Sequence, residues 1–231
     1  MSDAAEEASK PVPADLAGAI AAEAARIGII VPPDAAARLA AYAASLWAWN
    51  ERLNLTRHTD VGRFVSRDVG DSAALLAHLA HGERVLDVGT GGGVPGVILA
   101  ILRPDLRVEL SDSVAKKARA VAEIVREAGL TIPVHAAAAQ ELVASRPAGA
   151  ARFDTLVARA VAPLSKLLSW FEPRADSFGR LLVIKGPRWE EELAEARANR
   201  LGKKVSIRRI ASWPLVGTAS ESVLLEIRTA G

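Results

Sequence analysis

The sequence predicts an α/β protein with a Rossmann-like, mostly parallel sheet, an antiparallel C-terminal strand and a small helical subdomain in front. From Glu83 onward, short apolar runs typical of buried strands alternate with helical patterns. The first of these runs leads into four glycines within the five positions Gly89 to Gly93. The last two runs have a Pro/Gly turn but no helix between them, which predicts a terminal hairpin with an antiparallel strand at the edge of the sheet.

The N-terminal third is predicted to be helical. Met1 to Pro13 is rich in small, charged and proline residues, so we expect a disordered tail. Helices are expected over Asp15 to Gly28 and Asp34 to Leu53, each with its Asp as N-cap, and again over Asp60 to His81. One apolar face of the second helix carries Leu39, Tyr42, Leu46, Trp49 and Leu53. We therefore expect a helical subdomain over residues 14–81 and a second domain over residues 82–231.

The second domain is predicted to alternate between strands and helices. The expected strands are Arg84–Val88, Arg107–Ser111, Val134–Ala137, Thr155–Ala158, Arg180–Lys185, Val205–Trp213 and Ser222–Arg228. The expected helices are Pro95–Leu102, Val114–Ala128, Leu164–Phe171 and Glu190–Arg200. A second nucleotide-binding half of the dinucleotide type is not expected, because the chain ends in a hairpin.

The glycine-rich loop after the first strand indicates a nucleotide-type pocket, and two cofactors fit it. Gly91-x-Gly93-x-x-Gly96, with Asp112 further on, satisfies the dinucleotide fingerprint of NAD proteins. Asp87-x-Gly89-x-Gly91 suits S-adenosylmethionine better, because carboxylates at strand ends match its cationic sulfonium and its ribose. We favour S-adenosylmethionine, with Asp112 as the carboxylate that binds both ribose hydroxyls.

Composition restricts the classes of function. The 231 residues carry a net charge of +2 with a pI near 9.1, which permits an anionic partner such as RNA. Cysteine is absent and the histidines are scattered, so no metal site is expected. No signal peptide or membrane-spanning run is found, and we expect a cytoplasmic monomer without a membrane partner.

Several short motifs resemble the RsmG/GidB family of bacterial 16S rRNA guanine-N7 methyltransferases. The resemblance runs from about Leu46 to Ile227. The matching pieces are Trp49-Asn50, Asn54-Leu55-Thr56, Asp71-Ser72, Asp87-x-Gly89-Thr90-Gly91-x-Gly93-x-Pro95-Gly96, Arg103-Pro104, Asp112-Ser113, Arg159-Ala160 and Lys185-Gly186. The resemblance implies a class I fold and S-adenosylmethionine-dependent methylation of one guanine in the decoding-region loop of 16S rRNA, free or in the small subunit.

The resemblance also implies site residues. The cofactor contacts it implies, together with the acids and glycines of the loop motif, are Asp87, Gly89, Gly91, Val94, Asp112, Ala139, Gln140 and Arg159. The substrate candidates are Asn54, Asp71, Arg159, Lys185 and Arg188. No catalytic acid or base is expected, because guanine N7 is an unprotonated lone pair and the reaction depends on positioning. Among the tryptophans, Trp189 is the candidate for base stacking, whereas the others are expected to pack.

Three positions depart from the family pattern. Asp68 stands where the family has His, Ala138 where a basic residue is common, and Ser222 where Arg is frequent. These changes keep a second hypothesis open, in which the protein binds S-adenosylmethionine but has another RNA target or no turnover. An NAD-dependent oxidoreductase is the third alternative, but the sequence shows neither a hydride-handling residue nor a substrate domain.

Overall fold

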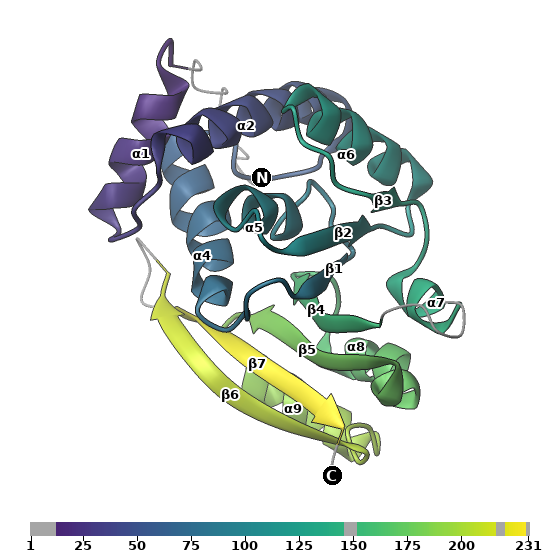
Figure 1. The fold of residues 1–231 in the computed structure, drawn as a ribbon. Coiled ribbons are helices and arrows are strands. Elements are labelled where there is room, and N and C mark those ends of the chain that lie inside the picture. Colours follow the sequence, from purple (N-terminus) through teal and green to yellow (C-terminus); the bar gives the residue numbers. More distant parts are fainter. Residues whose placement is uncertain (1–12, 146–151, 216–219, 230–231) are drawn as a thin grey trace, which may run out of the picture.

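One seven-stranded sheet separates two layers of helices in the computed structural model, which describes residues 13–145, 152–215 and 220–229 (Figure 1). The strands lie in the order β3-β2-β1-β4-β5-β7-β6. Their bounds are β1 Arg84–Val88, β2 Arg107–Ser111, β3 Val134–His135, β4 Phe153–Arg159, β5 Phe178–Lys185, β6 Val205–Pro214 and β7 Glu221–Thr229. All seven predicted strands are present; β1 and β2 have the predicted bounds, and the ends of the others differ by one or two residues.

The first five strands are parallel, and β7 is antiparallel to both β5 and β6. The predicted hairpin therefore lies at the edge of the sheet, but its antiparallel strand is the inner one. The last strand of the chain, β7, pairs with β5, and β6 covers its other side. This arrangement gives the apolar strand β7 two neighbours, and it leaves the more exposed strand β6 at the edge.

Helices from the N-terminal part and from the nucleotide fold share one face of the sheet (Figure 1). This layer holds α1 Leu16–Arg26, α2 Pro33–Leu53, α3 Val61–Arg63, the π-helix Phe64–Val69, α4 Gly70–Leu76, α5 Gly96–Leu102 and α6 Ala115–Glu127. The other layer holds α7 Ala139–Ala144, α8 Leu164–Phe171, the 3₁₀-helix Glu172–Ser177 and α9 Trp189–Ala198. None of the helices in the described residues is long and apolar enough to cross a membrane.

Successive side chains of each strand contribute in turn to two hydrophobic cores, one on each face of the sheet. In β1, Val85 belongs to the core shared with α2 and α5, whereas Leu86 belongs to the core shared with α8. Because successive strand side chains point to opposite faces, an apolar run fills both layers at once. The core under the first layer is continuous from α1 to the sheet, so the N-terminal helices pack directly on the nucleotide fold.

Some local expectations were wrong. Asp15 caps α1 by accepting from the Gly18 amide, but Asp34 lies in the first turn of α2, which begins after Pro32 without a side-chain cap. The helix expected over Asp60 to His81 is divided into α3, a π-helix and α4, and it ends at Leu76. Helix α7 and the 3₁₀-helix had no periodic signal of their own. The predicted tail, Met1 to Pro13, lies outside the described residues except for Pro13.

Candidate functional site

A large cavity lies at the carboxyl ends of the parallel strands. Its volume is about 1290 Å³. The glycine loop after β1, Asp112 after β2, the end of β4 and the end of β5 form its floor. The loop from Asn54 to His58, between α2 and α3, forms a wall above them. Ligands in open α/β sheets bind at this edge, so the cavity is the candidate site.

The glycine loop is held from below by Asp87. Its Oδ2 accepts a hydrogen bond from Thr90 Oγ1 at 2.6 Å and another from the Gly96 amide at 2.9 Å. From the other side, the buried Tyr42 of α2 donates to the Gly92 carbonyl at 2.8 Å. Gly93 has φ +106°, and a Cβ there would lie 3.0 Å from the Tyr42 hydroxyl. The loop is therefore pre-shaped by the sheet and by the N-terminal helices together.

Asp87 itself is fully buried and does not line the cavity. Burial raises the pKa of its carboxyl to about 7, against the hydrogen bonds from Thr90 and Gly96, which lower it. Its Oδ1 has no hydrogen-bond partner among the described residues. The carboxylate therefore shapes the loop, and it places a buried acidic group beneath the site where a cationic ligand would be favoured.

Asp112 lies at the end of β2 and faces the cavity. Its Oδ2 accepts from the Gly91 amide at 3.0 Å, and its Oδ1 accepts from the Val114 amide at 2.8 Å. These two bonds fix the carboxylate beside the glycine loop, with lone pairs left for a ligand diol. The residues present thus fit an adenosyl cofactor, because a fixed acid and a side-chain-free loop meet at one point.

Arg159 at the end of β4 is enclosed by acids of the N-terminal helices. Its guanidinium donates to Asp68 Oδ1 at 2.5 Å and to Asp71 Oδ2 at 3.0 Å. Asp71 Oδ1 in turn accepts from Trp213 Nε1 of β6 at 3.0 Å. The side chain of Arg159 is only 16% exposed. This network ties the N-terminal helices and the C-terminal hairpin to the cavity.

Lys185 at the end of β5 makes a second buried connection. Its Nζ donates to Glu192 Oε2 of α9 at 2.6 Å and to the Ala162 carbonyl at 2.7 Å. The same Glu192 oxygen accepts from the Leu164 amide at 2.7 Å. Lys185 is therefore not a solvated strand-end lysine, because it holds the loop between β4 and α8 against the floor of the cavity.

Most of the predicted site residues lie together. The cavity is lined by eight of them, Asn54, Asp71, Gly89, Gly91, Val94, Asp112, Arg159 and Lys185. Four others do not line it, namely Asp87, Ala139, Gln140 and Arg188. Ala139 is buried at the start of α7, and the Arg188 side chain is 80% exposed and pairs with Glu191. Trp189 packs against the second core, and it is Trp170 that lines the cavity.

Several cavity residues had no direct signal in the sequence. Arg57, His58, Arg67 and Trp170 line the cavity, although none was predicted as a site residue. Arg57 and His58 directly follow the Asn54-Leu55-Thr56 motif, so the motif was the available signal. The motif asparagines have structural roles, since Asn54 is the left-handed C-cap of α2 with φ 46°. Asn50 Oδ1 accepts from the Leu55 and Thr56 amides.

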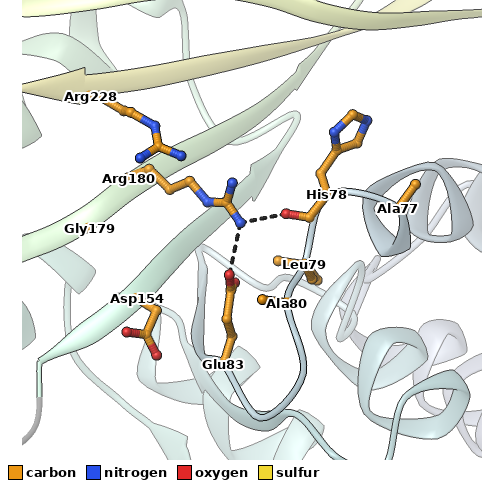
Figure 2. A pocket seen from close by; sticks show the side chains of 9 residues that line it. All are labelled: Ala77, His78, Leu79, Ala80, Glu83, Asp154, Gly179, Arg180 and Arg228. Carbon is orange, nitrogen blue, oxygen red and sulfur yellow. Dashed lines mark hydrogen bonds and ion pairs between the residues drawn. The ribbon is translucent and has the colours of Figure 1, made fainter.

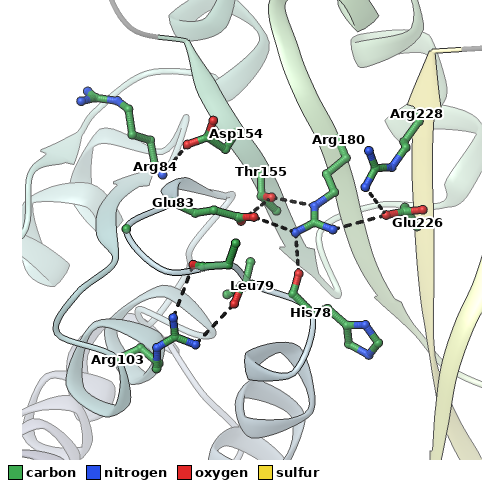
Figure 3. A network of polar contacts seen from close by, with 12 residues as sticks. His78, Leu79, Glu83, Arg84, Arg103, Asp154, Thr155, Arg180, Glu226 and Arg228 are labelled. Carbon is green, nitrogen blue, oxygen red and sulfur yellow. Dashed lines mark hydrogen bonds and ion pairs between the residues drawn. The ribbon is translucent and has the colours of Figure 1, made fainter.

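A smaller hollow of about 570 Å³ lies at the opposite edge of the sheet (Figure 2). Arg180 of β5 dominates it, and its guanidinium meets Thr155, Glu83, Glu226 and the His78 carbonyl (Figure 3). All of its nitrogens are engaged by protein acceptors, and the strands begin at this edge. This hollow is a structural junction between the sheet and the segment after α4, and the candidate site is the larger cavity.

No group of three or more residues that could hold a metal ion is found in the parts of the chain that the structure describes. Two histidines in these parts each pair with one carboxylate, His135 with Glu109 and His58 with Asp68.

Comparisons with known proteins agree on one family. Residues 35–213 match the GidB model, described as rRNA small subunit methyltransferase G. Ribosomal RNA small subunit methyltransferase G of Rhodopirellula baltica is 46% identical over 180 residues, which cover 78% of this chain and 76% of that protein. The protein of the same name from Chromohalobacter salexigens is 36% identical over 206 residues, covering 89% and 94%.

A solved structure shares the fold at low sequence identity. A variant of MtNAS in complex with S-adenosylmethionine matches with a TM-score of 0.54 and 14% identity, covering 95% of this chain and 80% of that one.

Proposed function

Because the chain belongs to the GidB family of small-subunit rRNA methyltransferases, we propose that it methylates N7 of one guanine in the decoding-region loop of 16S rRNA. The chain is an S-adenosylmethionine-dependent enzyme that acts on small-subunit ribosomal RNA. We propose N7 as the methylated atom and the decoding-region loop as the place of the target guanine. We further propose that the enzyme acts as a monomer in the cytoplasm, where ribosomal subunits are found.

The observation that supports this proposal is that one cavity is lined both by residues that suit a cofactor and by cationic residues that suit RNA. On one side lie the glycine loop and the fixed carboxylate of Asp112, which suit an adenosyl group. On the other side lie Arg57 and Arg67, whose cationic side chains suit a nucleotide of RNA. A volume of about 1290 Å³ accommodates both ligands at once.

The chain's own residues act by positioning. When bound, S-adenosylmethionine supplies the electrophilic methyl group. We propose that Asp112 binds the ribose hydroxyls and that the backbone of Gly89, Gly91 and Val94 lies against the cofactor. Arg159 keeps the N-terminal helices closed over the cavity, since its guanidinium is committed to Asp68 and Asp71. Because guanine N7 needs no deprotonation, an in-line geometry and exclusion of water are sufficient.

The proposal predicts a single labelled guanine. Small subunits from cells that lack N7 methylation are incubated with the protein and tritiated S-adenosylmethionine, and cleavage at N7-methylguanine maps the base. Label at one guanine of the decoding-region loop supports the proposal. Tight cofactor binding with no label in rRNA, free or assembled, contradicts it and favours a cofactor-binding protein with another RNA target or no turnover.

A variant tests the cofactor half of the site. We expect Asp112→Ala to raise the dissociation constant for S-adenosylmethionine roughly 10- to 100-fold, because charge-assisted hydrogen bonds to the cofactor and to the loop are lost. Isothermal titration calorimetry measures it. Asp34→Ala, on the exposed first turn of α2, is the matched control and should leave the affinity unchanged. An unchanged affinity of Asp112→Ala would remove this residue from the cofactor site.

A further inference from the structure

His58 occupies a fixed place in the cavity wall. Its amide donates to Thr56 Oγ1 at 3.0 Å, and its carbonyl accepts from Trp47 Nε1 at 2.8 Å. The start of the same loop is held by Asn50 Oδ1, at 2.6 Å from the Leu55 amide. A loop residue bound on both sides in this way is pre-organised for contact with a ligand, so little ordering is needed when the ligand arrives.

The imidazole is oriented by a buried acid. His58 Nδ1 lies 2.7 Å from Oδ1 of Asp68, which has no exposed surface. A carboxylate at this distance requires a proton on Nδ1, and Nε2 is then the lone-pair nitrogen of the neutral ring. Arg159 lies against the same Asp68 oxygen at 2.5 Å and offsets its charge.

Nε2 of His58 is an available acceptor in the cavity wall. His58 lines the cavity, and its Nε2 has no hydrogen-bond partner within the described ranges. Both oxygens of Asp71 are engaged by Arg159 and Trp213, and Asp112 is the carboxylate proposed to bind the ribose hydroxyls of the cofactor. The neighbouring side chains Arg57 and Arg67 are donors only.

The chemistry of the target base requires such an acceptor. When N7 of guanine faces the methyl donor, N1–H and the N2 amino group point to the other side of the base. Enzymes that act on an extruded base read it by hydrogen bonds to this Watson–Crick edge. Adenine presents an acceptor at N1, which would face the His58 lone pair without a proton between them.

We propose that His58, oriented by Asp68, recognises the target guanine by accepting a hydrogen bond at Nε2 from its Watson–Crick edge. This inference rests on the proposed function, because it assumes a guanine in the cavity with N7 toward the cofactor. His58 is then a specificity-determining residue, and Asp68 is the residue that positions it.

Two substitutions of His58 separate recognition from structure. Asn can donate to Asp68 in place of Nδ1 but carries nothing at the Nε2 position, whereas the longer Gln can bring an amide oxygen near that position. The exposed His81, at the opposite edge of the sheet, gives the matched control His81→Asn. Cofactor affinity is measured by calorimetry, and methylation is measured on small subunits reconstituted with either guanine or adenine at the target position.

We expect His58→Asn to lower kcat/KM for the guanine substrate roughly 10- to 100-fold, the effect of an unpaired donor on a buried base. Its activity toward the adenine substrate and its cofactor affinity should stay unchanged, so the preference for guanine falls by the same factor. His58→Gln should regain part of the preference, and His81→Asn should behave as the wild type. A guanine preference that survives His58→Asn, or a loss of cofactor affinity in parallel with activity, overturns the inference. A wild-type protein that labels neither substrate refutes the proposed function itself.

Discussion

At the scale of single residues, Asp87 shows how a buried acid can serve a site that it does not touch. Its carboxylate joins the Thr90 hydroxyl to the Gly96 amide, so the glycine loop keeps one shape. The cost is a buried acid with one oxygen unpaired among the described residues, which raises its pKa to about 7. Stability and site geometry are therefore linked through this one group.

The raised pKa predicts a pH dependence of stability. In the unfolded chain an Asp titrates near ~4, so the folded state binds the proton more tightly. The stabilisation from this group is fully present below pH ~4 and is lost as the pH rises through about 7. We expect the thermal unfolding midpoint of Asp87→Asn, relative to that of the wild type, to be higher at about pH 8 than at about pH 5. Both midpoints are measured without cofactor. A difference between the two proteins that is the same at both pH values would show that Asp87 does not titrate between them.

At the scale of elements, the N-terminal helices and the sheet build the glycine loop together. Tyr42 of α2 reaches the Gly92 carbonyl, and Leu46 of the same helix lies 3.0 Å from where a Cβ of Gly92 would be. A domain boundary near residue 81 remains a reasonable proposal from the sequence. In the structure, however, one continuous core crosses that boundary and reaches the loop.

This contact makes the loop sensitive to a single methyl group. We expect Gly93→Ala to lower the free energy of unfolding by about 1–3 kcal/mol and to weaken cofactor binding, because φ is +106° and the new Cβ would lie 2.8 Å from Val97 Cγ2. Chemical denaturation and calorimetry measure the two effects. Gly186→Ala is the matched control, since its Cβ would meet no atom within 4 Å. Equal stabilities of the two variants would contradict the role of the loop geometry.

The strands and the core of the cavity floor could be predicted from the sequence, whereas in the wall only Asn54 was predicted. The strands β1 and β2 and the helix α8 have the predicted bounds, because an apolar run flanked by turn residues is a local signal. Asp112 and Lys185 were predicted because they end such runs. His58 and Asp68 were not predicted as partners, because their contact depends on a π-helix and on the packing of Arg159, neither of which leaves a periodic pattern.

At the scale of the whole molecule, the two edges of the sheet have separate tasks. The carboxyl edge carries the cavity, and the amino edge carries the network around Arg180, which joins β4, β5 and β7 to the segment before β1 (Figure 3). Burial raises the pKa of Glu226, but hydrogen bonds from Arg228, Arg208 and Arg180 outweigh it and hold the pKa at about 2. The stabilisation from Glu226 is therefore present above the unfolded pKa, near ~4, and is lost as the pH falls toward 2.

Because the Arg180 network and the cavity lie at opposite edges of the sheet, a change in the network should lower stability without weakening cofactor binding. We expect Arg180→Met to lower the free energy of unfolding by about 3 kcal/mol or more, because Glu83 and Glu226 lose a buried partner. The dissociation constant for S-adenosylmethionine should not change at a temperature where the variant is folded. In a second variant, Glu226→Gln, the thermal unfolding midpoint should fall less steeply below about pH 4 than it does in the wild type. A weakened cofactor affinity in Arg180→Met would show that the two edges are coupled through the sheet.

The balance of charge over the whole chain predicts how the substrate is held. A net charge of +2 is too small to hold RNA by itself, so binding should depend on the few cations gathered around the cavity, such as Arg57, Arg67 and Lys117. Each cation that neutralises a phosphate adds about 0.7–0.9 to the slope of log affinity against log salt concentration. We expect Arg57→Gln and Lys117→Gln each to reduce that slope by about one unit for 16S rRNA, and to leave cofactor affinity unchanged. Arg188→Gln, on the exposed start of α9 and outside the cavity, is the control that distinguishes local contacts from net charge. If all three variants reduce the slope equally, the RNA is held by the overall field of the protein, and the wall of the cavity has no special part in it.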